Sequence, residues 1–371
     1  MNVTQTITPP VRMPQRGRIR RNWPAWVPYA AALWSLGYGV VALVWTLSGS
    51  GFPLGENDPG GNLSMLGEVS AEVGAPLFAA VALGGAGIAM LMARVRSLAE
   101  LPPWWRRIAI WFGSVMAVLL LAVVPDGRVL AVTGYLPLII VVAPFNAEFR
   151  DRIMENLGAA DLNLLAVIIG GFLWAMATLA FARRTAGLCV RCGRGEREPA
   201  WATPAAAARW GRWPTYVAAV IPAVYAATRW TWVLGYPMGI DAEFHAEGMA
   251  SGELWAGAWL GTFGLIGTVL TLGLVKRWGE VFPRWMPRIG GRAVPVGLAV
   301  VPATFVSVIV FNGGTSMIIA SSGDGVLALD AENWAALGPV LLWPVWGIAL
   351  GAATLAYYLR RRGQCSTCGR G

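Results

Sequence analysis

The sequence predicts an all-α polytopic membrane helix bundle, made of two parallel tandem repeats of about four transmembrane helices each. Three observations lead to this fold class. The 371-residue chain is 56% hydrophobic and only 13% charged, whereas a soluble protein of this length needs a larger charged surface. Several apolar runs reach the ~20 residues that a bilayer-spanning helix needs. Arginines gather in short segments between those runs, which is the positive-inside pattern of membrane topology.

The net charge of +9 is also typical of nucleic-acid-binding proteins. In this chain, however, the basic residues alternate with apolar runs and do not form one continuous patch, so we expect a lipid bilayer and no nucleic acid as the partner. The arginine-rich N-terminus is followed by no small-residue cleavage pattern. The first apolar run is therefore expected to stay in the protein as a helix.

The first half of the chain predicts four spans, at roughly 24–47, 73–93, from about 108 to a break at "VPDGR" (124–128), and at 162–182. The loop between the first two spans carries acidic residues and no Lys or Arg, so it is expected to face outward. The segment 128–145 is almost long enough to span. A crossing there would place the following arginine-rich segment outside, so we predict a re-entrant or interfacial piece, covered by protein or water.

The second half predicts spans at roughly 214–235, 254–275, 294–320 and 336–358, and its loops at 236–253 and 321–335 contain no Lys or Arg. Both termini are therefore expected to be cytoplasmic in a multi-pass plasma-membrane protein. The predicted organisation is a basic cytoplasmic tail (1–22), a first membrane repeat (23–195), a cytoplasmic linker (196–212) and a second membrane repeat (213–371). Each repeat ends in a CxxCGRG heptad.

Short matches in the same order relate the two halves. "FPLG" (52–55) returns as "YPMG" (236–239), Glu72 matches Glu253, and "TLAF" (178–181) returns as "TLAY" (354–357) before the two cysteine heptads align. "WP" (23–24) also returns as "WP" (213–214), and the pattern ExxPxW (100–105) returns at 280–285. Six matches in order predict a tandem duplication. With four crossings in each half, the copies share one orientation, and their symmetry axis runs along the membrane normal.

The four cysteines form two near-identical motifs, "CVRCGRG" (189–195) and "CSTCGRG" (365–371). Parallel repeats bring both motifs to the same cytoplasmic face, where thiols stay reduced and paired cysteines are more often metal ligands than disulfides. These motifs resemble the paired knuckles of zinc-ribbon proteins. The resemblance implies a structural Zn ion held by Cys189, Cys192, Cys365 and Cys368. A redox dithiol and cysteines without a metal are the alternatives.

A second candidate site is polar and lies near the outer face. The only histidine, His245, is flanked by Asp241 and Glu243 in the loop after the fifth span. This cluster is either a cation or substrate site or a hydrated acidic loop.

Arg229 lies within an apolar span, where a charge costs ~2.5–3.5 kcal/mol, so it either snorkels to the interface or pairs with an acid. Asp126 lies at the break of the third span.

"NGG" (312–314) is expected to break the seventh span at the position that corresponds to Asp126. Broken helices at matching positions of two repeats indicate a binding site. The alternative is an ordinary Asp-Gly turn at the membrane surface.

The chain also resembles uncharacterised multi-pass membrane proteins of high-GC Gram-positive bacteria, through "ATRWTWVLGYPMGI" and the CxxCGR tails. That resemblance implies no activity. The sequence contains no HExxH, GxSxG, P-loop or dinucleotide motif, so we predict a non-enzymatic protein. Small-molecule transport or sensing is the leading hypothesis. A membrane enzyme for a lipid or hydrophobic substrate, and an anchor that recruits a cytosolic protein partner, are the alternatives.

Overall fold

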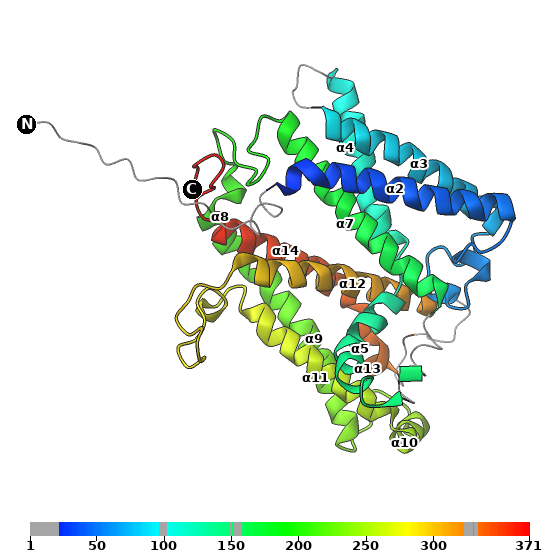
Figure 1. Cartoon of the computed structure of the whole chain (residues 1–371). Helices are drawn as coiled ribbons and strands as arrows, with labels where there is room; N and C mark the ends of the chain where they lie inside the picture. Colours follow the sequence, from blue (N-terminus) through cyan, green and yellow to red (C-terminus); the bar gives the residue numbers. More distant parts are fainter. Residues whose placement is uncertain (1–21, 96–101, 148–149, 152–157, 323–328, 330–332) are drawn as a thin grey trace, which may run out of the picture.

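The protein is described from a computed structural model that covers residues 22–95, 102–147, 150–151, 158–322, 329 and 333–371 (Figure 1). The described part is all-helical, and its one β element is an isolated bridge between Val281 and Ala293. The long helices are α2 (Trp23–Ser48), α3 (Ala71–Arg94), α4 (Pro103–Val118), α7 (Ala159–Thr185), α9 (Arg212–Val233), α11 (Glu253–Leu272), α12 (Val296–Ser322) and α14 (Trp343–Arg361). The shorter helices are α5 (Arg128–Val142), α8 (Pro204–Trp210), α10 (Ala242–Ser251) and α13 (Trp334–Leu341).

The helices form two groups that follow the chain order (Figure 1). In the N-terminal bundle, α2 packs on α3 and on α7, and α4 packs on α7. In the C-terminal bundle, α9 packs on α11 and on α14, and α12 packs on α14. α5 packs on both α7 and α12, so it lies where the two bundles meet.

Seven helices among the described residues are long and apolar enough to cross a membrane. They cover Trp23–Ser48, Ala71–Arg94, Pro103–Val123, Ala159–Thr185, Glu253–Leu272, Val296–Ser322 and Trp334–Arg361. By length and composition, they indicate a membrane protein. The predicted span at 214–235 forms a helix, α9, but it is not one of the seven. Two arginines, two prolines and several Trp and Tyr side chains lower its mean hydropathy.

The predicted break in the third span is present. α4 continues into a π-helical turn at Leu119–Val123, and the chain then turns before α5. α5 is 15 residues long, which at 1.5 Å per residue gives about 22 Å. A helix of this length is shorter than the ~30 Å hydrocarbon core of a bilayer.

The expected break at "NGG" (312–314) is wrong, because α12 runs without interruption from Val296 to Ser322. The two glycines serve close packing instead. A Cβ atom on Gly313 would lie 2.5 Å from the Leu130 side chain, and one on Gly314 would lie 2.3 Å from Pro344. Asn312 is fully buried and donates its side-chain N–H to the backbone oxygen of Leu121 in the π-helical turn.

Candidate metal centre

Each cysteine heptad folds into the same tight turn just after the last helix of its bundle. The Cys189 N–H donates to the backbone oxygen of Arg194 at 3.0 Å, and the Gly193 N–H donates to the backbone oxygen of Cys189 at 2.7 Å. In the second turn, the Cys365 N–H donates to Arg370 and the Gly369 N–H donates to Cys365, both at 2.8 Å. The two turns therefore share one hydrogen-bond pattern, residue for residue.

The glycine after the second cysteine is required by the backbone of this turn. Gly193 has a φ of 75° and Gly369 a φ of 71°. This left-handed region costs a residue with a Cβ atom roughly 1–2 kcal/mol, whereas glycine adopts it without this steric cost. The sequence CxxCG thus specifies the turn that brings both thiols of a motif to one side.

The two turns face each other, and their sulphur atoms meet. The Sγ atoms of Cys189 and Cys365 are 3.9 Å apart, and those of Cys192 and Cys368 are 3.6 Å apart. All four Sγ atoms lie within 4.8 Å of one another, and all four cysteines are free thiols. A tetrahedral site with metal–sulphur bonds of ~2.3 Å has sulphur–sulphur edges of about 3.8 Å. The four cysteines therefore form a group that can bind one metal ion.

Two arginines join the turns with equivalent contacts. Arg194 donates to the backbone oxygen of Arg370 at 2.9 Å, and Arg370 donates to the backbone oxygen of Arg194 at 3.3 Å. The partners in each of these pairs, and in both sulphur pairs, lie 176 positions apart in the sequence. The site therefore has local two-fold symmetry, with one ligand of each kind from each bundle.

Further basic side chains surround the sulphur atoms. Arg194 is buried and also donates to the backbone oxygens of Arg362 and Gly363. Arg362 donates to the backbone oxygen of Cys192 and forms an ion pair with Glu198. Arg183 donates to two backbone oxygens within the first turn. This positive environment stabilises thiolates, which are the form of cysteine that binds metals.

The surroundings lower the pKa of two of the thiols, Cys189 and Cys365, and raise that of Cys192. Burial raises the pKa of Cys365, but hydrogen bonds from the N–H groups of Thr367 and Cys368 and from the Cys192 and Cys368 thiols together outweigh it, and the pKa falls to about 6. Cys189 follows the same pattern, because the N–H groups of Cys192 and Arg191 outweigh burial and lower its pKa. For Cys192, burial and the neighbouring thiols raise the pKa to about 12. A metal ion held by these four cysteines would replace the thiol protons, because only thiolates bind metals.

Arg229 lies elsewhere, in the half of α9 away from the cysteines. The side chain is buried and donates to the backbone oxygens of Ala335 at 3.0 Å and Ala336 at 2.9 Å. Its guanidinium stacks over the rings of Tyr225 and Trp232, with centroid distances of 4.5 and 4.2 Å. Two carbonyls and two aromatic rings thus compensate its charge, and the described residues place no acid within ion-pair distance of it.

The predicted cluster around the histidine is spread along α10. Asp241 caps the helix, because its carboxylate accepts hydrogen bonds from the N–H groups of Glu243 and Phe244. The Nε2 atom of His245 lies 2.9 Å from the backbone oxygen of Trp232 and ties α10 to α9. The Glu243 side chain is exposed. The structure therefore gives Asp241 and His245 clear roles in holding this short helix.

Asp126 is part of a buried charge cluster with Asp58 and Arg128, and it is the only member that the sequence predicts as a site residue. Arg128 donates to the carboxylates of both Asp126 and Asp58, with shortest distances of 2.6 and 2.5 Å. Both aspartates are buried. The N–H of Gly127 donates to the hydroxyl of Ser316 in α12 at 2.7 Å. This cluster thus connects the loop between α2 and α3, the break after α4 and the C-terminal bundle.

Comparisons with protein-family models, with curated proteins and with solved structures find no match to this chain.

Proposed function

We propose that Cys189, Cys192, Cys365 and Cys368 bind one structural zinc ion that clamps the two bundles together. The observation that carries the proposal is the meeting of two identical turns, with sulphur–sulphur distances of 3.6 and 3.9 Å. Four thiolates complete the tetrahedral shell that zinc prefers and leave no open position for water or substrate. The role of the ion is therefore structural.

The two bundles are, on this proposal, tandem repeats related by an axis along the membrane normal. The helix pairs α2·α3, α2·α7 and α4·α7 correspond in order to α9·α11, α9·α14 and α12·α14. Two matched arginines support the same relation. Arg184 donates to the backbone oxygens of Met92 and Val95 at the end of α3. Arg360, 176 positions later, donates to Leu274 just after α11.

The cysteine face is proposed to be the cytoplasmic face of the plasma membrane, because the basic segments at the ends of α3, α7, α11 and α14 adjoin it. Single cysteines at Asn57 and Ala242 should then react with a membrane-impermeant thiol reagent added outside. A cysteine at Ala205 should not react. Labelling at Ala205 from outside would contradict the eight-span scheme and make residues 128–145 a true crossing.

Zinc content tests the clamp. Cys365→Ser should lower the zinc content of the purified protein to near zero while the protein stays in the membrane, since the apolar spans insert without metal. The matched control is Ser366→Ala, which changes the neighbouring residue and should keep the zinc. Equal zinc in both variants would contradict the proposal.

Small-molecule transport or sensing at the boundary between the bundles is the role we propose for the clamped architecture. Its support is the buried Asp58–Arg128–Asp126 cluster beside a π-helical turn and a broken helix. Irregular backbone beside buried charged side chains is typical of binding sites in membrane proteins. The alternatives are an enzyme for a lipid or hydrophobic substrate and an anchor for a cytosolic partner.

Solvent access to Asn312 tests the transport role, because this residue is fully buried and joins α12 to the π-helical turn through Leu121. A transport pathway that opens there would let a small, membrane-impermeant thiol reagent label Asn312→Cys in intact cells or inverted vesicles. The control position is Val310, which is buried on the same helix. No labelling of Asn312→Cys from either side would contradict transport through this boundary.

A further inference from the structure

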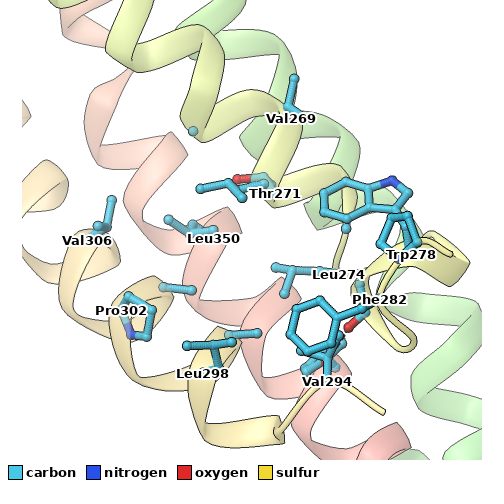
Figure 2. A pocket seen from close by; sticks show the side chains of 18 of the residues that line it. Val269, Thr271, Leu274, Trp278, Phe282, Val294, Leu298, Pro302, Val306 and Leu350 are labelled. Atoms are coloured by element: carbon cyan, nitrogen blue, oxygen red, sulfur yellow. Dashed lines mark hydrogen bonds between the residues drawn. The ribbon is translucent and has the colours of Figure 1, made fainter. Parts of the chain in front are cut away.

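An apolar cavity of about 690 Å³ opens in the C-terminal bundle, on the side of the cysteine face. α11, α12 and α14 form its walls, and the loop between α11 and α12 (273–295) closes one end. Figure 2 shows side chains from all these segments that point into a common space. The labelled lining residues are Val269, Thr271, Leu274, Trp278, Phe282, Val294, Leu298, Pro302, Val306 and Leu350. The volume falls in the ~300–1,000 Å³ range of ligand sites.

The corresponding place in the N-terminal bundle is filled. Trp174 in α7 is fully buried and packs edge-on against Phe112 in α4, with ring centroids 5.6 Å apart. The 176-residue spacing of the cysteines puts Leu350 at the position of Trp174. Pro302 takes the place of Phe112 when "GSVMAV" (113–118) is aligned with "ATFVSV" (303–308). Both replacements line the cavity, so two smaller side chains leave it open.

The cavity opens sideways, on the surface that faces the lipid. Leu270 on α11 is 62% exposed and Leu298 on α12 is 59% exposed, and both line the cavity. α3 and α4 pack against each other in the N-terminal bundle, whereas α11 and α12 stand apart with the cavity between them. An occupant can therefore enter from within the bilayer.

The loop at the end of the cavity is basic and folded. It carries five exposed cations, Lys276, Arg277, Arg284, Arg288 and Arg292. Its acid, Glu280, is held by Arg360 at 2.9 Å and Arg361 at 3.8 Å. Within the described residues, none of the five cations forms an ion pair. The bridge between Val281 and Ala293 and the bond from the Phe282 N–H to Arg292 fix the loop.

We propose that the cavity binds one anionic phospholipid from the leaflet on the cysteine side. The acyl chains occupy the apolar cavity between α11 and α12, and the basic loop binds the phosphate. Basic pockets between transmembrane helices recognise anionic head groups in this way. The proposal rests on the membrane placement proposed above but does not need the zinc ion. The lipid site lies within the C-terminal bundle and is separate from the site proposed for transport or sensing at the boundary between the bundles.

Native mass spectrometry of the purified full-length protein tests the proposal, with phosphatidylglycerol and phosphatidylcholine of identical chains as probes. One phosphatidylglycerol should stay bound, and phosphatidylcholine should bind much more weakly. Replacing Arg284, Arg288 and Arg292 together by Gln should weaken phosphatidylglycerol binding about 100-fold, since each cation contributes about fivefold. The matched control replaces Arg107, Arg197 and Arg209, three exposed arginines away from the cavity, and should keep the lipid.

Leu350→Trp tests the cavity itself, because it introduces the residue found at Trp174. This variant should lose the bound lipid and keep its zinc content, which also reports that it is folded. Equal binding of both lipids, or lipid retention in both the Gln variant and Leu350→Trp, would overturn the lipid site. A protein that purifies without detergent would instead overturn the proposed membrane placement, so the two failures are distinguishable.

Discussion

The N-terminal and C-terminal bundles have the same helix pairings but differ in how completely they are packed. At the cysteine end they agree closely, through two identical turns and the matched contacts of Arg184 and Arg360. Midway along the helices they differ, because Trp174 is fully buried whereas Leu350 lines a cavity of about 690 Å³.

The comparison distinguishes contacts that hold the two bundles together from packing that can change without separating them. The contacts at the cysteine end involve backbone groups and sulphur atoms. Those between the cysteine pairs and between Arg194 and Arg370 join the two bundles and fix their relative position. The packing between α11 and α12 lies within the C-terminal bundle and does not fix the relative position of the two bundles. Its loop and side chains can therefore change to accept a ligand while the clamp stays the same.

Removing the metal should have the largest effect. Zinc binding contributes ~10–16 kcal/mol in small zinc peptides. A strong chelator should lower the thermal stability of the protein in detergent and raise proteolysis in the 196–212 segment. The helix content measured by circular dichroism should stay constant. The matched control is Cys365→Ser, whose stability should not respond to the chelator. An equal response in both proteins would mean that the cysteines are not the site of action.

Arg128→Gln should give the next largest loss, because it leaves the buried carboxylates of Asp58 and Asp126 without their cation. Breaking a buried ion pair in this way costs about 3–5 kcal/mol of unfolding free energy. Arg229→Gln is the matched comparison, since Arg229 donates to two carbonyls and no carboxylate, and it should cost ~1.5–3 kcal/mol. Unfolding in mixed detergent measures both losses. A smaller loss for Arg128→Gln than for Arg229→Gln would contradict the role of the charge cluster.

Trp174→Leu tests the packing difference between the bundles, because it gives the N-terminal bundle the residue of the C-terminal one. It removes a fully buried ring and its hydrogen bond to Ser35, and should cost about 3 kcal/mol. Leu350→Ala should cost less, since Leu350 already borders a cavity. Equal losses in the two variants would mean that the cavity does not distinguish the bundles.

The smallest effect compares the two glycines of the cysteine turns. Gly193→Ala and Gly369→Ala should each cost ~1–2 kcal/mol from the positive φ. Gly193→Ala should cost more, because its Cβ atom would lie 2.9 Å from the Arg183 side chain, whereas nothing lies within 4 Å at Gly369. The zinc affinity of each variant, measured by competition with a chelator, gives the comparison. A weaker effect at Gly193 would show that Arg183 does not pack against this turn.

The helices and the cysteine group could be predicted because each has a strong local signal. Apolar runs of about 20 residues give the spans, and the CxxCG motif gives its own turn. The meeting of Cys189 with Cys365 was also expected from the predicted duplication, in which equivalent ends of the two repeats share one face. The local motifs and their order along the chain were enough to predict these features.

The charge cluster and the cavity depend on contacts that no local pattern encodes. Asp58 was assigned to an acidic outer loop, and its bond to Arg128 crosses 70 residues. The break expected at 312–314 was wrong because glycines in a helix can serve close packing as well as a break. Arg229 is compensated by backbone oxygens of Ala335 and Ala336, which no search for acidic partners would find.

The zinc-to-protein ratio of the wild-type protein, measured together with its X-ray absorption spectrum, tests the central claim most directly. One ion shared by both bundles predicts a ratio near one and a shell of four sulphur atoms at ~2.3 Å. A ratio near zero would remove the clamp. A ratio near two, or a shell with two sulphur atoms and two lighter ligands, would show that each cysteine pair binds its own metal and does not join the bundles.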